Sequence, residues 1–150
     1  MSEAAKHYDL ICIGGGSGGI ATARRAAAHG ARAAVIEVDR LGGTCVNVGC
    51  VPKKVMWQAA HTAEVMTRAQ DYGFSALTPS VDWGALVKAR AAYIERLNGI
   101  YARNLDNAAV DSISGYARFV DAHTVEVDGA HYSADRFVIA TGGVPGRPGI

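Results

Sequence analysis

Two cysteines, Cys45 and Cys50, stand in the run GGTCVNVGCVPKK. In a regular helix, residues i and i+5 have Cα atoms roughly 8–9 Å apart, whereas a disulfide needs less than about 7 Å. A bond between them therefore requires a distorted helix start, for which Gly49 and Pro52 are suited. A helix N-terminus also favours the thiolate, the nucleophilic form of cysteine. We predict a redox-active pair; the alternative is two reduced core cysteines, which is how we interpret Cys12.

A glycine loop of the form GxGxxG precedes the cysteines, after an apolar run and before an alanine-rich segment. In that context Gly14 permits a tight turn, Gly16 lets a phosphate come close, and Gly19 lets helix and strand pack together. The helix N-terminus adds N–H donors and a partial positive charge. We predict a dinucleotide site here, against the alternative of a glycine-rich turn without a ligand.

An acidic residue completes this pattern. Glu37 lies 18 residues past Gly19, near the end of a second apolar run. A carboxylate in that place can accept hydrogen bonds from ribose hydroxyls. Residues 8–13, 20–29 and 33–38 are therefore predicted as strand, helix and strand, the opening unit of a doubly wound α/β sheet.

Three basic residues are further candidates. Lys53 follows Cys50 by three residues, so it projects from the same helix face and could stabilise charge on a reduced flavin. The alternative is a solvated surface lysine. Either Arg24 or Arg25 could form a bidentate pair with a substrate carboxylate, and the residues alone do not choose between them. The five histidines are scattered without ligand spacing, so no metal site is predicted.

Composition narrows the class of protein. Apolar residues make up 49% of the 150, which excludes a disordered chain, and a net charge of +1 gives no argument for nucleic acid or membrane surface. The polar start and the lack of a long apolar run indicate a cytoplasmic location. In that compartment a disulfide is more often catalytic than structural.

The remaining segments complete the expected fold. Residues 45–69 are predicted to be mostly helical after a disturbed start, and residues 81–105 form a second long helix. Short strands are predicted over 116–120, 124–127, 131–132 and 137–140, as a small antiparallel β-meander. The chain then stops after a strand and a glycine-rich turn, so we expect it to be the front part of a longer protein.

These motifs resemble those of the pyridine nucleotide–disulfide oxidoreductases. GGTCVNVGCVPKK is similar to the redox-active segment of that family, and GGGSGG and IATGG resemble its two FAD-binding motifs. The VPKK run and residues 96–104 are similar to the class I branch that reduces glutathione disulfide with NADPH. The small Ala21 and basic Arg24 suit the carboxylates of glutathione, whereas the trypanothione branch has acidic and aromatic residues there.

Other functions remain as alternatives for this sequence. The branches that act on mercuric ion or dihydrolipoamide usually carry serine where Lys53 stands, and they remain alternatives together with the trypanothione branch. A non-enzymatic FAD-binding redox module is an alternative from another class.

The resemblance implies an incomplete, Rossmann-like FAD-binding domain over residues 1–150, without the NADPH and dimer-interface domains. It also implies a homodimer whose general-acid histidine comes from the partner subunit, so this fragment alone is expected to be inactive. Cys45 would attack glutathione disulfide, and Cys50 would resolve the mixed disulfide beside the flavin.

The residue roles carried over from the family fall into three groups. The catalytic residues are Cys45 and Cys50. Glutathione would contact Ser17, Arg24 and Tyr101. The residues implied to bind FAD are Gly14, Gly16, Ser17, Gly18, Gly19, Glu37, Thr44, Cys45, Lys53, Ala117, Thr141 and Gly142.

Overall fold

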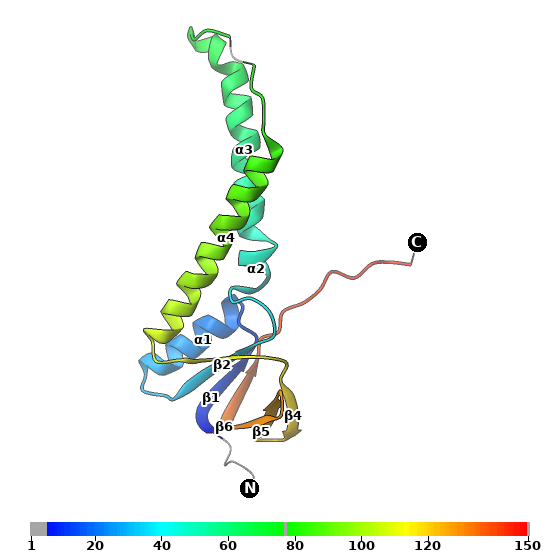
Figure 1. The fold of residues 1–150 in the computed structure, drawn as a ribbon. Coiled ribbons are helices and arrows are strands. Elements are labelled where there is room, and N and C mark those ends of the chain that lie inside the picture. The colour runs from blue at the N-terminus through cyan, green and yellow to red at the C-terminus, as the bar shows by residue number, and fades with distance from the viewer. Residues whose placement is uncertain (1–5, 77, 150) are drawn as a thin grey trace.

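The computed structural model describes residues 6–76 and 78–149, which form a six-stranded sheet and a long helical hairpin that projects from it (Figure 1). The strands lie in the order β3-β2-β1-β6-β5-β4. Neighbours among the first four are parallel, and β4 and β5 continue the sheet in antiparallel fashion. This confirms the predicted α/β class with a mostly parallel sheet and a small meander. The strands are β1 (Lys6–Ile13), β2 (Ala33–Glu37), β3 (Asp111–Ser114), β4 (Arg118–Asp121), β5 (Thr124–Val127) and β6 (Ala130–Ile139).

Helices cover one face of the parallel strands. Helix α1 (Ser17–Ala28) and the end of helix α4 (Trp83–Asp106) lie on this face. Cys12 and Val35 of the sheet pack there with Ile20 and Ala23 of α1 and Leu105 of α4. Successive side chains of a strand point to opposite faces of the sheet. The residues next to Cys12 and Val35 in their strands therefore point to the other face.

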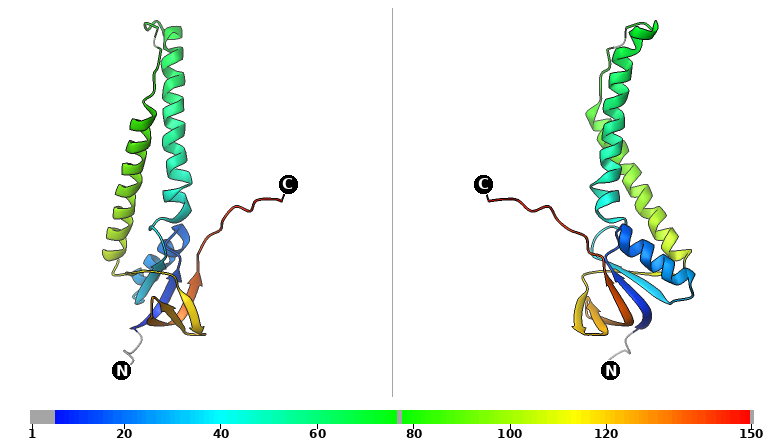
Figure 2. Two further views of the ribbon diagram at one scale, coloured as in Figure 1. Left: turned by 45° about the vertical axis from the view of Figure 1, so that its right-hand side comes forward. Right: turned by 180° about the vertical axis from the view of Figure 1, so that it is seen from behind.

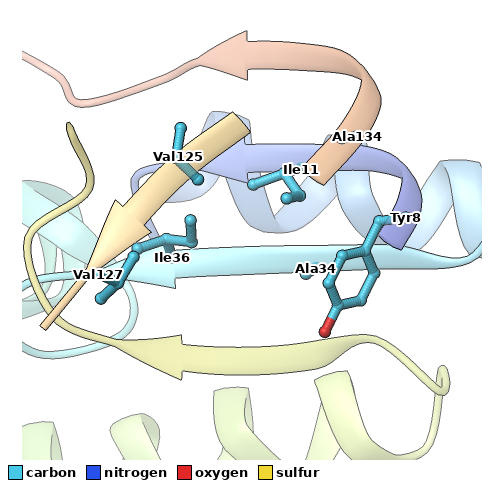
Figure 3. Close-up of a cluster of buried hydrophobic side chains, with 7 residues drawn as sticks. All are labelled: Tyr8, Ile11, Ala34, Ile36, Val125, Val127 and Ala134. Atoms are coloured by element: carbon cyan, nitrogen blue, oxygen red, sulfur yellow. The ribbon is translucent and has the colours of Figure 1, made fainter. Parts of the chain in front are cut away.

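The β-meander covers the opposite face. Ile11 and Ile36 of the parallel strands meet Val125 and Val127 of β5, with Tyr8 at the edge of the cluster (Figure 3). Both faces of β1 and β2 are thus buried, which explains why their sequences are nearly continuous apolar runs.

The carboxyl ends of the parallel strands meet at one edge of the sheet. Ile13 of β1 pairs with Ile36 of β2 and Ile139 of β6, and Glu37 of β2 pairs with Ser114 of β3. The segments that leave these strands include the glycine loop and the start of the C-terminal segment. In open α/β sheets, ligands bind at this edge.

The helical hairpin lies above the same edge. It begins with α2 (Gly43–Asn47) and α3 (Cys50–Arg68), turns through the short helix η1 (Ala69–Tyr72) and returns along α4. Figure 2 shows α3 and α4 side by side and extending well away from the sheet. Asp82 caps the N-terminus of α4, and its carboxylate accepts a hydrogen bond from the N–H of Ala85 at 2.9 Å. None of the helices in the described part of the chain is long and apolar enough to cross a membrane.

Several boundaries differ from those expected. The sequence gives no sign of β3, because the run DSIS becomes a strand only by pairing with β2. The two strands expected over 131–132 and 137–140 are one continuous strand, β6, held by β1 on one side and β5 on the other. Helix α1 begins three residues earlier than predicted, and β4 begins two residues later than the strand expected from residue 116.

Candidate redox and nucleotide-binding site

The glycine loop between β1 and α1 is tightly built at two of its positions. Gly14 has φ +111°, and a Cβ there would collide with the backbone of Ala140. A Cβ on Gly19 would collide with the carbonyl oxygen of Gly14, so this glycine lets α1 lie against β1. At Gly16 a Cβ would meet only the Cα of Gly43, at 3.7 Å. Gly16 itself lines a cleft.

The start of α1 is available to an anion. Gly16 is the N-cap and supplies no side chain to the first turn. The amide groups of a helix's first turn have no partner within the helix, and they carry the positive end of its dipole. The arrangement therefore suits a phosphate or pyrophosphate.

The Glu37 carboxylate ties the glycine loop to the end of β2. One oxygen, Oε2, accepts the N–H of Gly15 at 2.7 Å, and Oε1 accepts the N–H of Asp39 at 2.9 Å. A carboxylate oxygen can accept a further hydrogen bond, so acceptor capacity remains for a ligand.

A cleft of about 440 Å³, called the main cleft below, opens beside the glycine loop. It brings together eight of the predicted site residues from four separate segments. They are Gly16, Ser17, Gly18, Glu37, Thr44, Cys45, Thr141 and Gly142. A smaller side cavity of about 260 Å³ shares Glu37 and Thr141 with the main cleft and extends to Gly14 and Ala117. Two adjoining hollows at the carboxyl edge of a parallel sheet suit an elongated dinucleotide.

Other predicted residues lie outside both hollows. Arg24 is exposed on α1, and Lys53 is exposed on α3. Tyr101 is partly buried against the cluster beneath α1. Cys50 is exposed at the start of α3, and the buried Gly19 serves the packing of α1.

Three polar or charged residues that line the main cleft were not predicted: Asp39, Arg40 and Asn47. Asp39 and Arg40 lie two and three residues after Glu37, the last residue of β2. Their place after a parallel strand was the signal that could have found them, because such loops border the ligand site. Asn47 carried no comparable signal, since it lies inside the cysteine segment.

The distorted helix start that the sequence predicted is a break between two helices. Helix α2 ends at Asn47, and Gly49 has the non-helical angles φ −120° and ψ −108° before α3 starts at Cys50. Cys45 lies inside the short helix α2, and Cys50 begins the longer helix α3. The break arises because the run GTCVN makes its own helical turn before Gly49 redirects the chain. Both cysteines are thiols here, as is Cys12.

The two thiols hold their protons unequally. The pKa of Cys50 is lowered, chiefly because the Cys45 thiol donates a hydrogen bond to it and also because of its own N–H and the nearby Lys53 and Lys54. The pKa of Cys45 is raised, chiefly because it is the donor in that hydrogen bond. Of the two thiols, Cys50 therefore loses its proton more readily and Cys45 holds its proton more tightly. Burial raises the pKa of Cys12 to about 11, which leaves it unreactive.

Comparison with known proteins shows which family this chain belongs to. The family model described as pyridine nucleotide-disulphide oxidoreductase matches residues 8–150, so the chain belongs to that family. Over 96% of its length it is 48% identical to a glutathione reductase of Yarrowia lipolytica, and over 97% it is 50% identical to one of Schizosaccharomyces pombe. The matches cover 34% and 33% of those proteins, so the chain spans about a third of their length.

Proposed function

We propose that residues 1–150 form the N-terminal part of the FAD-binding domain of an enzyme that reduces glutathione disulfide with NADPH. The observation that carries this proposal is the placement of Cys45 in the wall of the main cleft, opposite the glycine loop. The similarity to two fungal glutathione reductases supports the choice of substrate. A cytoplasmic location suits a cysteine pair that must cycle instead of staying oxidised.

The residues of the two hollows fit FAD. The start of α1, with Ser17 and Gly18, would hold the pyrophosphate, and Glu37 would accept from the ribose hydroxyls. Ala117, in the side cavity, would border the adenine half, whereas Thr44 and Lys53 would lie toward the flavin. When bound, FAD passes two electrons from NADPH to the cysteine pair.

The cysteines would then carry out two exchange steps. Cys45 Sγ attacks one sulfur of glutathione disulfide, which forms a mixed disulfide and releases the first glutathione thiolate. Cys50 Sγ attacks the Cys45 sulfur, which releases the second glutathione and closes the Cys45–Cys50 disulfide. The thiolate is the nucleophilic form and the pKa of Cys45 is raised, so Cys45 needs a base to take its proton before it attacks. A histidine of the partner subunit would accept it, in keeping with the family resemblance.

Substrate contacts are proposed for Ser17, Arg24 and Tyr101. Arg24 is exposed, and its guanidinium forms no ion pair within the described residues. It can therefore pair with a carboxylate of glutathione without breaking an existing contact.

We also propose that the complete protein is a homodimer. The helical hairpin exposes large aromatic side chains, which favours a partner against it. They are Trp57, Tyr72, Phe74, Trp83 and Tyr93.

Oxidation of NADPH by the complete protein, followed with a panel of electron acceptors, tests the proposed function. The panel holds glutathione disulfide, trypanothione disulfide, lipoamide and mercuric ion. We expect bound flavin and the highest kcat/KM with glutathione disulfide. A clear preference for another acceptor would move the protein to that branch of the family. Bound flavin with no turnover of any acceptor would favour the non-enzymatic redox module.

A further inference from the structure

One peptide group, between Leu41 and Gly42, is held from both sides. Its N–H donates to the carbonyl oxygen of Gly15 in the glycine loop at 2.7 Å. Its carbonyl oxygen accepts a hydrogen bond from Nδ2 of Asn98 at 2.7 Å. Asn98 lies on α4, 57 positions further along the chain. The peptide therefore connects the glycine loop beside the main cleft to the helical hairpin.

Asn47 extends this connection to the cysteine segment. Nδ2 of Asn98 also donates to Oδ1 of Asn47, at 2.9 Å. In turn, Nδ2 of Asn47 donates to the carbonyl oxygens of Gly43 at 3.0 Å and, more weakly, of Arg40 and Leu41 at 3.2 and 3.3 Å. Both asparagines are half-buried, and a hydrogen bond shielded from water is electrostatically stronger. Asn47 ends the helix that carries Cys45, so the network reaches to within two residues of that thiol.

The same segment is fitted closely to its surroundings. A Cβ on Gly43 would lie 2.7 Å from the Cα of Gly16, so the two backbones already touch. Gly42 has φ +101°, and a Cβ there would lie 2.6 Å from the Cβ of Val46. A shift of the turn would therefore move the Cys45 helix against the glycine loop.

We propose that Asn98 is a positioning residue that fixes Cys45 in the wall of the main cleft through Asn47 and the Leu41–Gly42 peptide. The inference rests on the proposed function, because it gives Cys45 a flavin and a substrate to be aligned with. Asn98 itself lines neither hollow. Small errors of alignment at a reacting atom can lower a rate about a hundredfold.

Amide hydrogen exchange in the complete protein as purified tests the anchoring itself. Asn98→Ala and Asn47→Ala should each speed exchange at residues 42–48 by about tenfold, since each removes hydrogen bonds that hold the turn. The double variant should add little, because both side chains belong to one network. The control is Asn104→Ala, a half-buried asparagine of α4 with no side-chain hydrogen bond in the described part of the chain. Unchanged exchange in both single variants overturns the proposal.

Flavin-loaded protein tests the consequence for chemistry. Asn98→Ala should weaken the long-wavelength charge-transfer absorbance between the cysteine thiolate and the flavin in the NADPH-reduced protein. It should also lower kcat about tenfold, with KM for glutathione disulfide little changed. Asn98→Ser, which keeps one donor, should give values between those of wild type and Asn98→Ala. Amides of β1 that remain protected from hydrogen exchange show that each variant is folded. Absorbance and kcat equal to those of Asn104→Ala overturn the positioning role. A wild-type protein that does not reduce glutathione disulfide refutes the proposed function, while hydrogen exchange still decides the anchoring.

Discussion

At the scale of the residue, Cys50 is both the more exposed cysteine and the one whose pKa is lowered. In the chain by itself it is therefore the better nucleophile. The proposed mechanism assigns attack on the substrate to Cys45 instead. These two statements agree only if the bound flavin covers Cys50 and leaves Cys45 open to the substrate.

The order in which the cysteines are alkylated should therefore depend on FAD. In the NADPH-reduced, flavin-loaded protein, iodoacetamide should label Cys45 first, because the flavin shields Cys50. In the reduced flavin-free protein Cys50 should be labelled first, and its labelling should persist to lower pH than that of an ordinary thiol. Peptide mass spectrometry measures both, with the buried Cys12 as the unreactive reference. The same order with and without flavin would refute the assigned roles.

The Glu37 carboxylate should contribute to flavin retention. Glu37→Ala removes the acceptor for ribose and also the two hydrogen bonds that hold Gly15 and Asp39. We expect FAD affinity to fall by roughly 1–3 kcal/mol, as for the loss of hydrogen bonds to a charged group. Equilibrium titration of the flavin-free protein measures this, and Glu95→Ala, on the exposed side of α4, is the control. Equal FAD affinity in both variants would remove Glu37 from the cofactor site.

Arg24 should affect substrate binding more than turnover. Arg24→Ala should raise KM for glutathione disulfide roughly tenfold or more and lower kcat less, because a carboxylate clamp binds ground and transition states alike. Arg25→Ala, also exposed on α1, is the matched control. Steady-state kinetics with glutathione disulfide and with an artificial electron acceptor separate the two effects. If Arg24→Ala and Arg25→Ala behave alike, Arg24 is a solvated helix residue.

At the scale of the element, the position of α1 depends on one glycine. Gly19→Ala should destabilise the flavin-free protein by about 1–3 kcal/mol or more, because the new Cβ would collide with the Gly14 carbonyl oxygen. Gly18→Ala is the control: its Cβ would meet only the Cβ of Ala140, at 3.9 Å, and alanine favours a helix. Urea unfolding measures both. A Gly19→Ala variant as stable as Gly18→Ala would show that α1 can move away from β1 at little cost.

At the scale of the whole molecule, one polar cluster joins strands β1 and β3 of the sheet at the end opposite the main cleft. Asp111 of β3 accepts hydrogen bonds from the Tyr8 hydroxyl and from Lys6 Nζ of β1, both at 2.7 Å. Strand β2 lies between these strands, so the cluster spans it. Lys6, and then Tyr8, holds the pKa of Asp111 below its usual value of 3.8.

This cluster predicts a pH-dependent stability. A carboxyl whose pKa is lower in the folded than in the unfolded state stabilises the fold above the unfolded pKa, and the contribution is lost as pH falls through the folded pKa. Asp111→Asn should therefore be less stable than wild type at pH 7, and the difference should shrink below about pH 4. Urea unfolding across this range measures it, with the exposed Asp106→Asn as control. A difference that stays constant with pH would mean that the ionised carboxylate is not what stabilises β3.

The sequence by itself determined the features that depend on local residue type and spacing. The glycine loop between strand and helix, the distorted helix start at Cys45 and Cys50, and the α/β class followed from glycine geometry and from apolar periodicity. Backbone dihedral angles and short-range packing decide these features, and both depend on residues that are close together in the sequence.

Only the tertiary structure decided the features that depend on distant partners. Strand β3 is formed by its pairing with β2, and the single β6 is formed by pairing on both of its edges. The place of Asn98 at the Leu41–Gly42 peptide has the same origin, because α4 must fold back along α3 before its side chain can reach the turn. The raised pKa of Cys45 likewise depends on α2 and α3 bringing its thiol within hydrogen-bonding reach of Cys50. Residue spacing along the chain does not predict these contacts, because each requires a distant segment that only the packing of the whole molecule brings close.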